Sequence, residues 1–295
     1  MMSDMYVIPC RRALTANAGI SLVTGVVGAC LMASPDQQGL GVEHVSEFSG
    51  KCAIVTGGGS GLGLAIAVAF AKAGANVVVN GRRLERLEAA VRDIEAVSGK
   101  GVAVQADSTR REDALRTIEA AVKNYGRVDY LINNAQTTGL VAAIEDIDDH
   151  HWRSTIDSGL SGTLYHMQAA LPHLKVSKGA IVNMGSRQGT HGAEHYGAYA
   201  ATKEGIRGLS RVAAREFGPF GIRVNVINPA AETEGASDFF TTNPGSREFF
   251  ENQASLRRIG SPESDIAPVA LFLCSQAASY MSGQTLNVDG GQVML

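Results

Sequence analysis

Cysteine is scarce in this chain, which has four cysteines in 295 residues. They are scattered, at positions 10, 30, 52 and 274, with no CxxC pair and no histidine at the spacing of a metal ligand. This spacing argues against a disulfide framework and against a zinc site. We therefore predict no metal site, and reduced thiols favour a cytoplasmic location.

An excess of positive charge is also lacking. Lysine and arginine number 26 against 29 aspartates and glutamates, so the formal net charge is −3, and aromatic residues make up 6% of the chain. The sequence has no basic patch with interleaved aromatic residues, so nucleic acid is not expected as a partner. A hydrophobic share of 45% and a charged share of 19% are typical of a globular protein. A small molecule is then the expected partner.

Residues 1–48 do not follow the pattern of the rest of the chain. Arg11 and Arg12 precede an uncharged stretch, residues 13–33, that is long enough to cross a bilayer, which takes about 20 apolar residues. Three interpretations stay open: an export signal with a twin-arginine start and a lipid-attachment site at Cys30, a weak membrane anchor, or an unstructured upstream segment. The alternative to a cytoplasmic protein is thus one that is exported or membrane-associated through residues 11–33.

From residue 49 onward, short apolar runs alternate with segments of helical spacing. Strands are predicted over residues 52–55, 76–80, 101–105, 128–132, 180–183, 222–227 and 285–288, and helices over residues 62–73, 84–97, 112–125, 148–174, 199–217 and 266–275. Such alternation predicts a parallel sheet with helices on both faces. We expect one α/β domain over residues 49–295, a doubly wound, Rossmann-type sheet of seven strands. Ligands bind such sheets beyond the carboxyl ends of the strands.

Residues 230–252 are predicted to form a polar loop. It is too long for an ordinary connection in a compact domain, so it is expected to cover the substrate pocket. Four phenylalanines in it suggest an apolar or ring-bearing substrate, although they fit core or subunit-interface anchors equally well. They are Phe239, Phe240, Phe249 and Phe250.

A glycine cluster follows the first predicted strand. The sequence KCAIVTGGGSGLG, residues 51–63, predicts a buried strand, a tight turn and the start of a helix. Glycines let the backbone approach a pyrophosphate closely, and the N–H groups at a helix start attract negative charge. A P-loop is excluded because Leu64 stands where a lysine would be needed. We predict a dinucleotide site whose phosphate loop comprises Gly57, Gly59, Ser60, Gly61, Leu62 and Gly63.

Two arginines, Arg82 and Arg83, follow the second predicted strand, where a dinucleotide fold recognises the adenosine ribose. No acidic residue is there to hold the 2′-hydroxyl of NAD, whereas guanidinium groups suit a 2′-phosphate. NADP(H) is therefore the expected cofactor and NAD(H) the alternative, while the purely structural interpretation is two solvated arginines that start a helix. Polar residues that follow the third and fourth strands are expected to face the same crevice, namely Asp107, Ser108, Asn133 and Asn134. Of these, Asp107, Ser108 and Asn134 are assigned to cofactor binding.

Tyr199 and Lys203 are four residues apart on a predicted helix, so their side chains project from one face. No other tyrosine of the chain has a lysine four residues further on. A phenol has a pKa of about 10 and is a poor base at neutral pH. A neighbouring ammonium and the positive charge of a nicotinamide would together lower that pKa. Ser186, at the end of another strand, would then hydrogen-bond the substrate oxygen.

Together these motifs resemble the short-chain dehydrogenase/reductase family over about residues 49–291, in particular 3-oxoacyl-[acyl-carrier-protein] reductases and other enzymes of ketones and secondary alcohols. The motifs are TGGGSGLG at 56–63, NNA at 133–135, Ser186, YAATK at 199–203, NP at 228–229 and GQTLNVDGG at 283–291. The resemblance implies hydride transfer between a nicotinamide and a carbonyl or secondary alcohol. It implies that Tyr199 acts as acid or base, that Lys203 lowers its pKa and holds the nicotinamide ribose, and that Ser186 positions the carbonyl oxygen. It also implies a homo-oligomer, commonly a tetramer.

The sequence departs from the family's pattern at four positions near this site. Gly159 stands where the family has a helical asparagine that helps to hold a proton-relay water near the active-site lysine. Gln136 and Ala230 each replace a glycine, and Glu234 replaces a threonine near the nicotinamide amide, for which the neighbouring Thr233 is the candidate. The alternative to an oxidoreductase is therefore a nucleotide-binding protein with weak or no catalysis.

Overall fold

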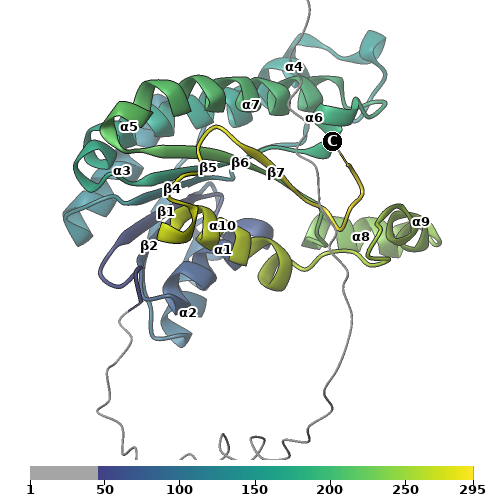
Figure 1. Ribbon diagram of the computed structural model, residues 1–295. Helices are drawn as coiled ribbons and strands as arrows, with labels where there is room; N and C mark the ends of the chain where they lie inside the picture. The colour runs from purple at the N-terminus through teal and green to yellow at the C-terminus, as the bar shows by residue number, and fades with distance from the viewer. Residues whose placement is uncertain (1–45, 295) are drawn as a thin grey trace, which may run out of the picture. The chain divides into compact units, whose positions relative to one another are not determined.

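The computed structural model describes residues 46–294 (Figure 1). The uncharged stretch at residues 13–33 lies outside them, so its three interpretations stay predictions. Among the described helices, none is both long and apolar enough to cross a bilayer. Phe48, which falls in the predicted N-terminal extension, is buried against Phe70 and Tyr130, with ring centroids 5.6 and 5.4 Å away. The folded domain therefore includes residues before 49.

Seven parallel strands form one sheet in this part of the chain, in the order β3-β2-β1-β4-β5-β6-β7 (Figure 1). The predicted seven-stranded Rossmann-type sheet is confirmed. The order reverses between β1 and β4, and ligands bind at such a switch point. The strands are β1 Cys52–Thr56, β2 Asn76–Gly81, β3 Lys100–Gln105, β4 Tyr130–Asn133, β5 Ala180–Met184, β6 Arg223–Pro229 and β7 Thr285–Val288.

Helices cover both faces of the sheet (Figure 1). On one face Ile66 and Phe70 pack with Val55 of β1, and on the other Met167 and Leu174 belong to a second apolar cluster. Both faces of β1 are therefore covered, and its five residues are all buried. The helices are α1 Gly61–Lys72, α2 Leu84–Ala96, α3 Arg111–Tyr125, α4 Asp149–Ile156, α5 Gly162–Ser177, α6 Arg187–His191, α7 Gly197–Phe217, α8 Glu234–Thr242, α9 Ser246–Gln253 and α10 Ala267–Cys274.

The single helix predicted over residues 148–174 is wrong, because a π turn at Asp157–Ser161 separates α4 from α5. Glycine has low helix propensity, and Gly159 and Gly162 both lie in this region. A Cβ at Gly162 would lie 2.8 Å from the backbone oxygen of Ser108, so the close approach of α5 to the loop after β3 requires glycine. The chain thus changes from α to π geometry beside the crevice.

The loop predicted over residues 230–252 is also wrong, since most of it forms α8 and α9. The phenylalanines of the two helices form one aromatic cluster: the ring of Phe250 lies 5.7 Å from those of Phe240 and Phe249 and 6.4 Å from that of Phe239. Packing of aromatic rings stabilises two short helices that would be marginal alone.

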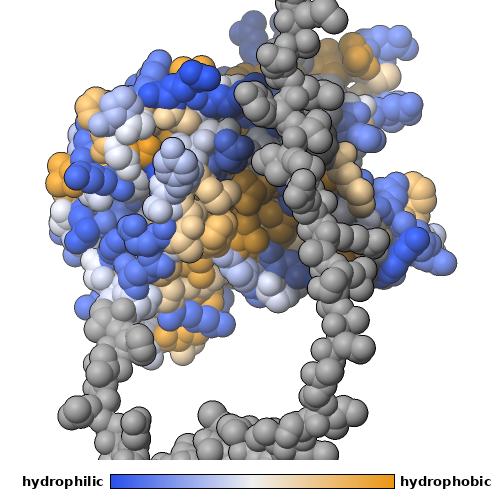
Figure 2. Space-filling view, in the orientation of Figure 1, coloured by the Kyte–Doolittle hydropathy of each residue, from blue (hydrophilic) through white to orange (hydrophobic). Residues whose placement is uncertain are grey.

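An apolar group of residues reaches the surface over β7 and α10 on the face seen in Figure 2. β7 is the last strand of the sheet, so this face includes a sheet edge. Phe272 of α10 has 39% of its surface exposed. An apolar surface beside an open sheet edge is suited to contact with another chain.

Candidate active site

The phosphate loop between β1 and α1 is held by side chains from neighbouring strands. The backbone N–H of Gly57 donates to Oδ1 of Asn80 at 3.2 Å, and Nδ2 of Asn134 donates to the backbone oxygen of Thr56 at 2.9 Å. Gly57 has a φ of +65°, which favours glycine. A Cβ at Gly63 would lie 2.3 Å from the backbone oxygen of Gly57, so α1 can approach the loop this closely only with glycine. The resulting cradle at the start of α1 fits a pyrophosphate.

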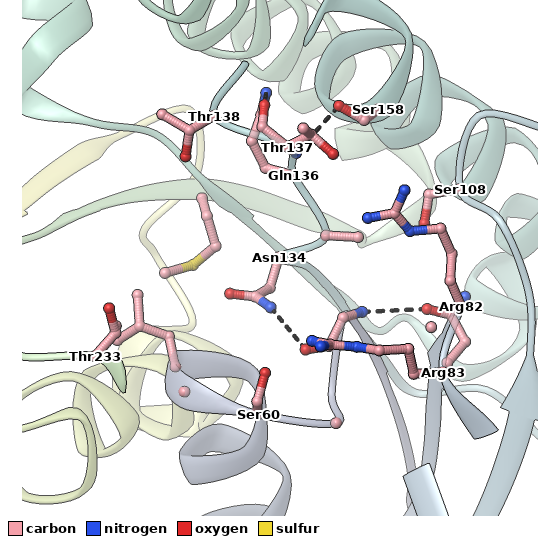
Figure 3. Close-up of a pocket in the computed structure, with 18 of the residues that line it drawn as sticks. Ser60, Arg82, Arg83, Ser108, Asn134, Gln136, Thr137, Thr138, Ser158 and Thr233 are labelled. Carbon is pink, nitrogen blue, oxygen red and sulfur yellow. Dashed lines mark hydrogen bonds between the residues drawn. The ribbon is translucent and has the colours of Figure 1, made fainter. Parts of the chain in front are cut away.

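One cavity of about 890 Å³ opens at this edge of the sheet (Figure 3). Its size is within the range of cofactor sites. Gly63 lies behind the phosphate loop, and Ser186 is not part of the cavity wall. The other residues predicted for the cofactor and for catalysis all line the cavity, namely Gly57, Gly59, Ser60, Gly61, Leu62, Arg82, Arg83, Asp107, Ser108, Asn134, Tyr199, Lys203 and Thr233.

Arg82 and Arg83 lie on the wall of the cavity at the end of β2, and both side chains are exposed (Figure 3). The backbone oxygen of Arg82 accepts a hydrogen bond from Nε2 of Gln105 at 3.0 Å, which holds the chain at the end of β2. Arg86, in the first turn of α2, instead pairs with Glu234 of α8 at 2.8 Å. Two guanidinium groups therefore face the cavity at the position expected for the adenosine ribose.

Lys203 is buried in α7, with 3% of its surface exposed. Its Nζ donates a hydrogen bond to the backbone oxygen of Met184 at 2.8 Å and lies 5.4 Å from the centroid of the Tyr199 ring. Because burial disfavours the charged amine, the pKa of Lys203 falls from 10.5 to about 7. Lys203 can therefore gain or lose a proton near neutral pH.

The pKa of Tyr199 is raised above its ordinary value of 10, chiefly because burial disfavours the phenolate. A hydrogen bond with Ser186 acts in the opposite direction, and Tyr196 adds to the increase. In the folded chain alone, desolvation thus outweighs the groups that favour the phenolate, and the lowering expected from the sequence is not found. That expectation included the charge of a nicotinamide as well as that of Lys203.

Ser186 is the N-cap of the short helix α6 and is 5% exposed. Its Oγ donates to Oε1 of Gln188 and accepts from the backbone N–H of Gln188 at 3.3 Å. The serine hydroxyl, which influences the pKa of Tyr199, is thus bound to Gln188, two residues further on. This bond to Gln188 was not predicted from the sequence.

Residues 57–292 match the family model described as enoyl-(acyl carrier protein) reductase. The solved structure of a short-chain type dehydrogenase/reductase from Mycobacterium ulcerans is similar, with a TM-score of 0.79 at 32% identity over 83% of this chain and 90% of that chain. This chain belongs to the short-chain dehydrogenase/reductase family. The predicted family is thereby confirmed.

Two relatives of this short-chain dehydrogenase/reductase are named for their reactions. A 12alpha-hydroxysteroid dehydrogenase of a Clostridium species is 40% identical over 251 residues, which cover 83% of this chain and 97% of that protein. A cyclohexanol dehydrogenase of an Acinetobacter species is 34% identical over 250 residues, 83% of this chain and 96% of that protein. The chain is accordingly an oxidoreductase of CH–OH or C=O groups that uses NAD(P).

One residue of this short-chain dehydrogenase/reductase does not lie where the sequence suggested. Asn133 was expected to face the crevice, but it is buried in β4, and its Nδ2 donates to Oδ1 of Asn183 at 2.8 Å. Successive side chains of a strand point to opposite faces, so Asn133 and the next residue, Asn134, cannot both point into the cavity.

Asn80, which was not predicted as a site residue, is fully buried at the end of β2 and lines the cavity. Besides its bond to Gly57, its Nδ2 lies 3.0 Å from both Oγ1 of Thr117 and Nε2 of His166. The available signal was a polar residue at the end of an apolar run, VVVN at 77–80. Asn80 therefore ties the phosphate loop to a buried polar network.

Proposed function

We propose that the protein is an NADP(H)-dependent oxidoreductase that transfers a hydride between the nicotinamide and a carbonyl or secondary alcohol, with Tyr199 as the proton donor or acceptor. The observation that carries this proposal is that Tyr199 and Lys203 reach from one face of α7 into the cavity that also holds the phosphate loop. When bound, the nicotinamide supplies or accepts the hydride. The proton is transferred by side chains of the protein.

In the reducing direction, Tyr199 donates its phenolic proton to the substrate oxygen as that oxygen gains negative charge, and in oxidation it takes the proton back. Lys203, with a pKa of about 7, is poised to restore the proton to Tyr199. Ser186, which lowers the pKa of Tyr199, orients the substrate oxygen by a hydrogen bond.

NADP(H) is preferred to NAD(H) in this proposal because Arg82 and Arg83 present two guanidinium groups at the ribose position. Guanidinium groups bind phosphate by paired, charge-assisted hydrogen bonds. Asp107 and Ser108 line the adenine side of the cavity and Thr233 the opposite side, beside Pro229. We assign Thr233 to the nicotinamide amide.

The substrate proposed is an apolar, ring-bearing ketone or secondary alcohol. The aromatic cluster of α8 and α9 is close to the site, because Arg187, next to Ser186, lies 5.6 Å from the centroid of Phe250. The names of the two relatives, which act on a steroid and on cyclohexanol, agree with this choice.

The test is a panel of cyclic ketones, hydroxysteroids, β-ketoacyl thioesters and sugars, each assayed with NADPH and NADH by absorbance at 340 nm. We expect turnover of ring-bearing substrates with a lower KM for NADPH than for NADH. A folded protein that binds NADPH but turns over no member of the panel would favour a nucleotide-binding role without catalysis. Turnover restricted to sugars would contradict the substrate proposal alone.

We further propose that the chain forms a cytoplasmic homotetramer. The apolar surface over β7 and α10 supports an association of copies (Figure 2), and the buried free thiols of Cys52 and Cys274 suit a reducing compartment. Light scattering coupled to size-exclusion chromatography tests the assembly, and a monomeric mass would contradict it. Cell fractionation tests the location, and recovery in the membrane fraction would contradict it.

A further inference from the structure

Arg187 lies just beyond the carboxyl end of β5, directly after Ser186, which the proposed function assigns to the substrate oxygen. The helix α6, which begins with Arg187, and the helix α9 lie on either side of the carboxyl ends of the last strands (Figure 1). The guanidinium of Arg187 reaches α9: its carbon lies 5.6 Å from the centroid of the Phe250 ring, and its Nη1 donates to Oε1 of Gln253 at 3.0 Å. A positive charge is therefore held between α6 and α9.

Most of the hydrogen-bonding capacity of Arg187 is unused. A guanidinium has five N–H donors, and within residues 46–294 that of Arg187 makes one hydrogen bond, to the neutral amide of Gln253, and no ion pair. The other half-buried arginines in this part of the chain are satisfied, because Arg86 and Arg207 pair with carboxylates and Arg223 donates to two backbone oxygens. Arg187 differs from them in having a charge without a partner of opposite sign.

The carboxylate of Asp289 acts on the charge of Arg187 but is bound elsewhere. Its Oδ1 accepts from the backbone N–H of Gly291 at 2.9 Å and its Oδ2 from that of Val293 at 3.0 Å, so it holds the turn after β7. Burial lowers the pKa of Arg187 below its ordinary value, and the opposing effects of Asp289 and Tyr196 are smaller. Because a half-buried charge without a partner costs free energy, a residue that keeps one beside a catalytic group indicates a site for a ligand of opposite charge.

We propose that Arg187 binds a carboxylate of the substrate, so that the substrate is a ring-bearing ketone or secondary alcohol with an acid group away from the reacting carbon. The inference rests on the proposed function and narrows its substrate class. A carboxylate is planar and accepts two parallel hydrogen bonds from a guanidinium. With Ser186 on the reacting oxygen and Arg187 on the acid group, the substrate is held at both ends, which fixes its orientation for hydride transfer.

The experiment measures kcat/KM with NADPH for two ketones that differ in charge, 4-oxocyclohexanecarboxylate and 4-oxocyclohexanecarboxamide. The wild-type enzyme should prefer the acid to the amide by roughly 10- to 100-fold, the contribution of a hydrogen bond to a charged group. Arg187→Gln removes the charge, so the acid should lose most of this advantage while kcat/KM for the amide changes little. Arg187→Lys keeps the charge but not the paired hydrogen bonds, so it should retain part of the preference.

Two further variants serve as controls. Arg211 is an exposed arginine of α7, so Arg211→Gln removes one positive charge elsewhere and should keep the wild-type ratio of acid to amide. Gln253→Ala removes the hydrogen bond between Arg187 and α9 but not the charge, so it should also keep that ratio. Because each ratio compares two substrates on one enzyme, a general loss of stability or activity cancels.

A second measurement needs no turnover. Cyclohexanecarboxylate has no carbonyl to reduce, and its Kd for the complex of enzyme and NADPH is measured by calorimetry. We expect Arg187→Gln to raise this Kd roughly tenfold or more.

A wild-type enzyme that does not distinguish acid from amide would overturn the acid site, as would equal losses of kcat/KM for the two ketones in Arg187→Gln. If the wild type reduces no ketone but binds cyclohexanecarboxylate, and Arg187→Gln weakens that binding, the proposed function fails and the acid site stands. Absent binding of cyclohexanecarboxylate to the wild type, or a Kd that Arg187→Gln leaves unchanged, would overturn the acid site whatever the turnover.

Discussion

The Nζ of Lys203 donates a hydrogen bond to the backbone oxygen of Met184 at 2.8 Å, inside a site that leaves 3% of the lysine exposed. This bond joins the second turn of α7 to the last residue of β5 and holds the amine near the ring of Tyr199. The pKa of about 7 follows from burial. The amine of this buried lysine is thereby set to titrate near neutral pH.

The first prediction concerns stability and pH in the cofactor-free protein. Between about pH 7 and the ordinary lysine pKa of 10.5, the unfolded chain binds more protons at this residue than the folded chain, so stability rises with pH. The stability of the wild type relative to Lys203→Met should therefore increase from pH 7 to pH 9.5 in urea titrations. Lys72→Met, at an exposed site of α1, is the control. A stability difference between the wild type and Lys203→Met that stays constant from pH 7 to pH 9.5 would contradict a lowered pKa for Lys203.

A second prediction concerns the buried His166. Its Nδ1 lies 2.9 Å from the backbone oxygen of Gly162, which can only accept, so Nδ1 carries the proton and Nε2 accepts from Nδ2 of Asn80. Burial lowers the pKa of His166 below 6.5. The unfolded chain then takes up the proton first, and stability is lost as the pH falls below about 6.5.

His166→Gln should lose less stability than the wild type between pH 7 and pH 5, as measured by thermal unfolding. The exposed His191 offers a matched control, since His191→Gln should keep the wild-type dependence on pH. Equal slopes for wild type and His166→Gln would mean that His166 accepts a proton in the folded state.

The cofactor preference gives a third prediction. Arg82→Ala should raise the Kd of NADPH by roughly 10- to 100-fold, because a hydrogen bond to a charged group contributes about 1.5–3 kcal/mol. The Kd of NADH should change little, since NADH lacks the 2′-phosphate. Fluorescence titration measures the Kd of each cofactor. Arg92 is an exposed arginine of α2, so Arg92→Ala controls for the loss of one positive charge. Equal losses for the two cofactors would refute the assignment to NADP(H).

Two glycines provide a fourth prediction. Gly63→Ala places a Cβ 2.3 Å from the backbone oxygen of Gly57, so it should cost about 1–3 kcal/mol of stability and weaken cofactor binding by displacing the phosphate loop. Gly208→Ala meets no atom within 4 Å inside α7 and should stabilise the protein by about 0.5–1 kcal/mol. Denaturant titration measures the free energy of unfolding of each variant. Equal changes in Gly63→Ala and Gly208→Ala would contradict the close packing of α1 against the phosphate loop.

The sequence predicted the sheet and most of the cavity wall because both depend on local signals. Apolar runs define strands such as β1, and the glycine spacing defines the phosphate loop. The glycines at 159 and 162 give only a weak local signal for the π turn at Asp157–Ser161, because the turn also depends on bonds that form after folding. These run from Nε2 of Gln136 to the backbone oxygen of Thr155 and from the N–H of Thr137 to Oγ of Ser158. The helices α8 and α9 were missed for a similar reason, since their rings pack on one another.

Among the site residues, too, those with a local sequence signal were predicted, and those that depend on burial or on distant contacts were not. Tyr199 and Lys203 could be recognised because helical spacing fixes their common direction. Asn133 was placed in the crevice by its position after a strand, but the strand continues through it and turns its side chain into the core. The increase in the pKa of Tyr199 depends on burial, which a sequence does not report.

The central claim is that Tyr199 exchanges the proton that accompanies hydride transfer. The most direct measurement is the rate of NADPH oxidation at 340 nm with a cyclic ketone, for the wild type, Tyr199→Phe and Tyr196→Phe. Tyr196 is the matched control because its ring centroid lies 6.1 Å from that of Tyr199. We predict that Tyr199→Phe lowers kcat by about 10²- to 10⁴-fold with unchanged NADPH affinity, while Tyr196→Phe keeps most of the rate. A Tyr199→Phe enzyme with the wild-type kcat would contradict the claim.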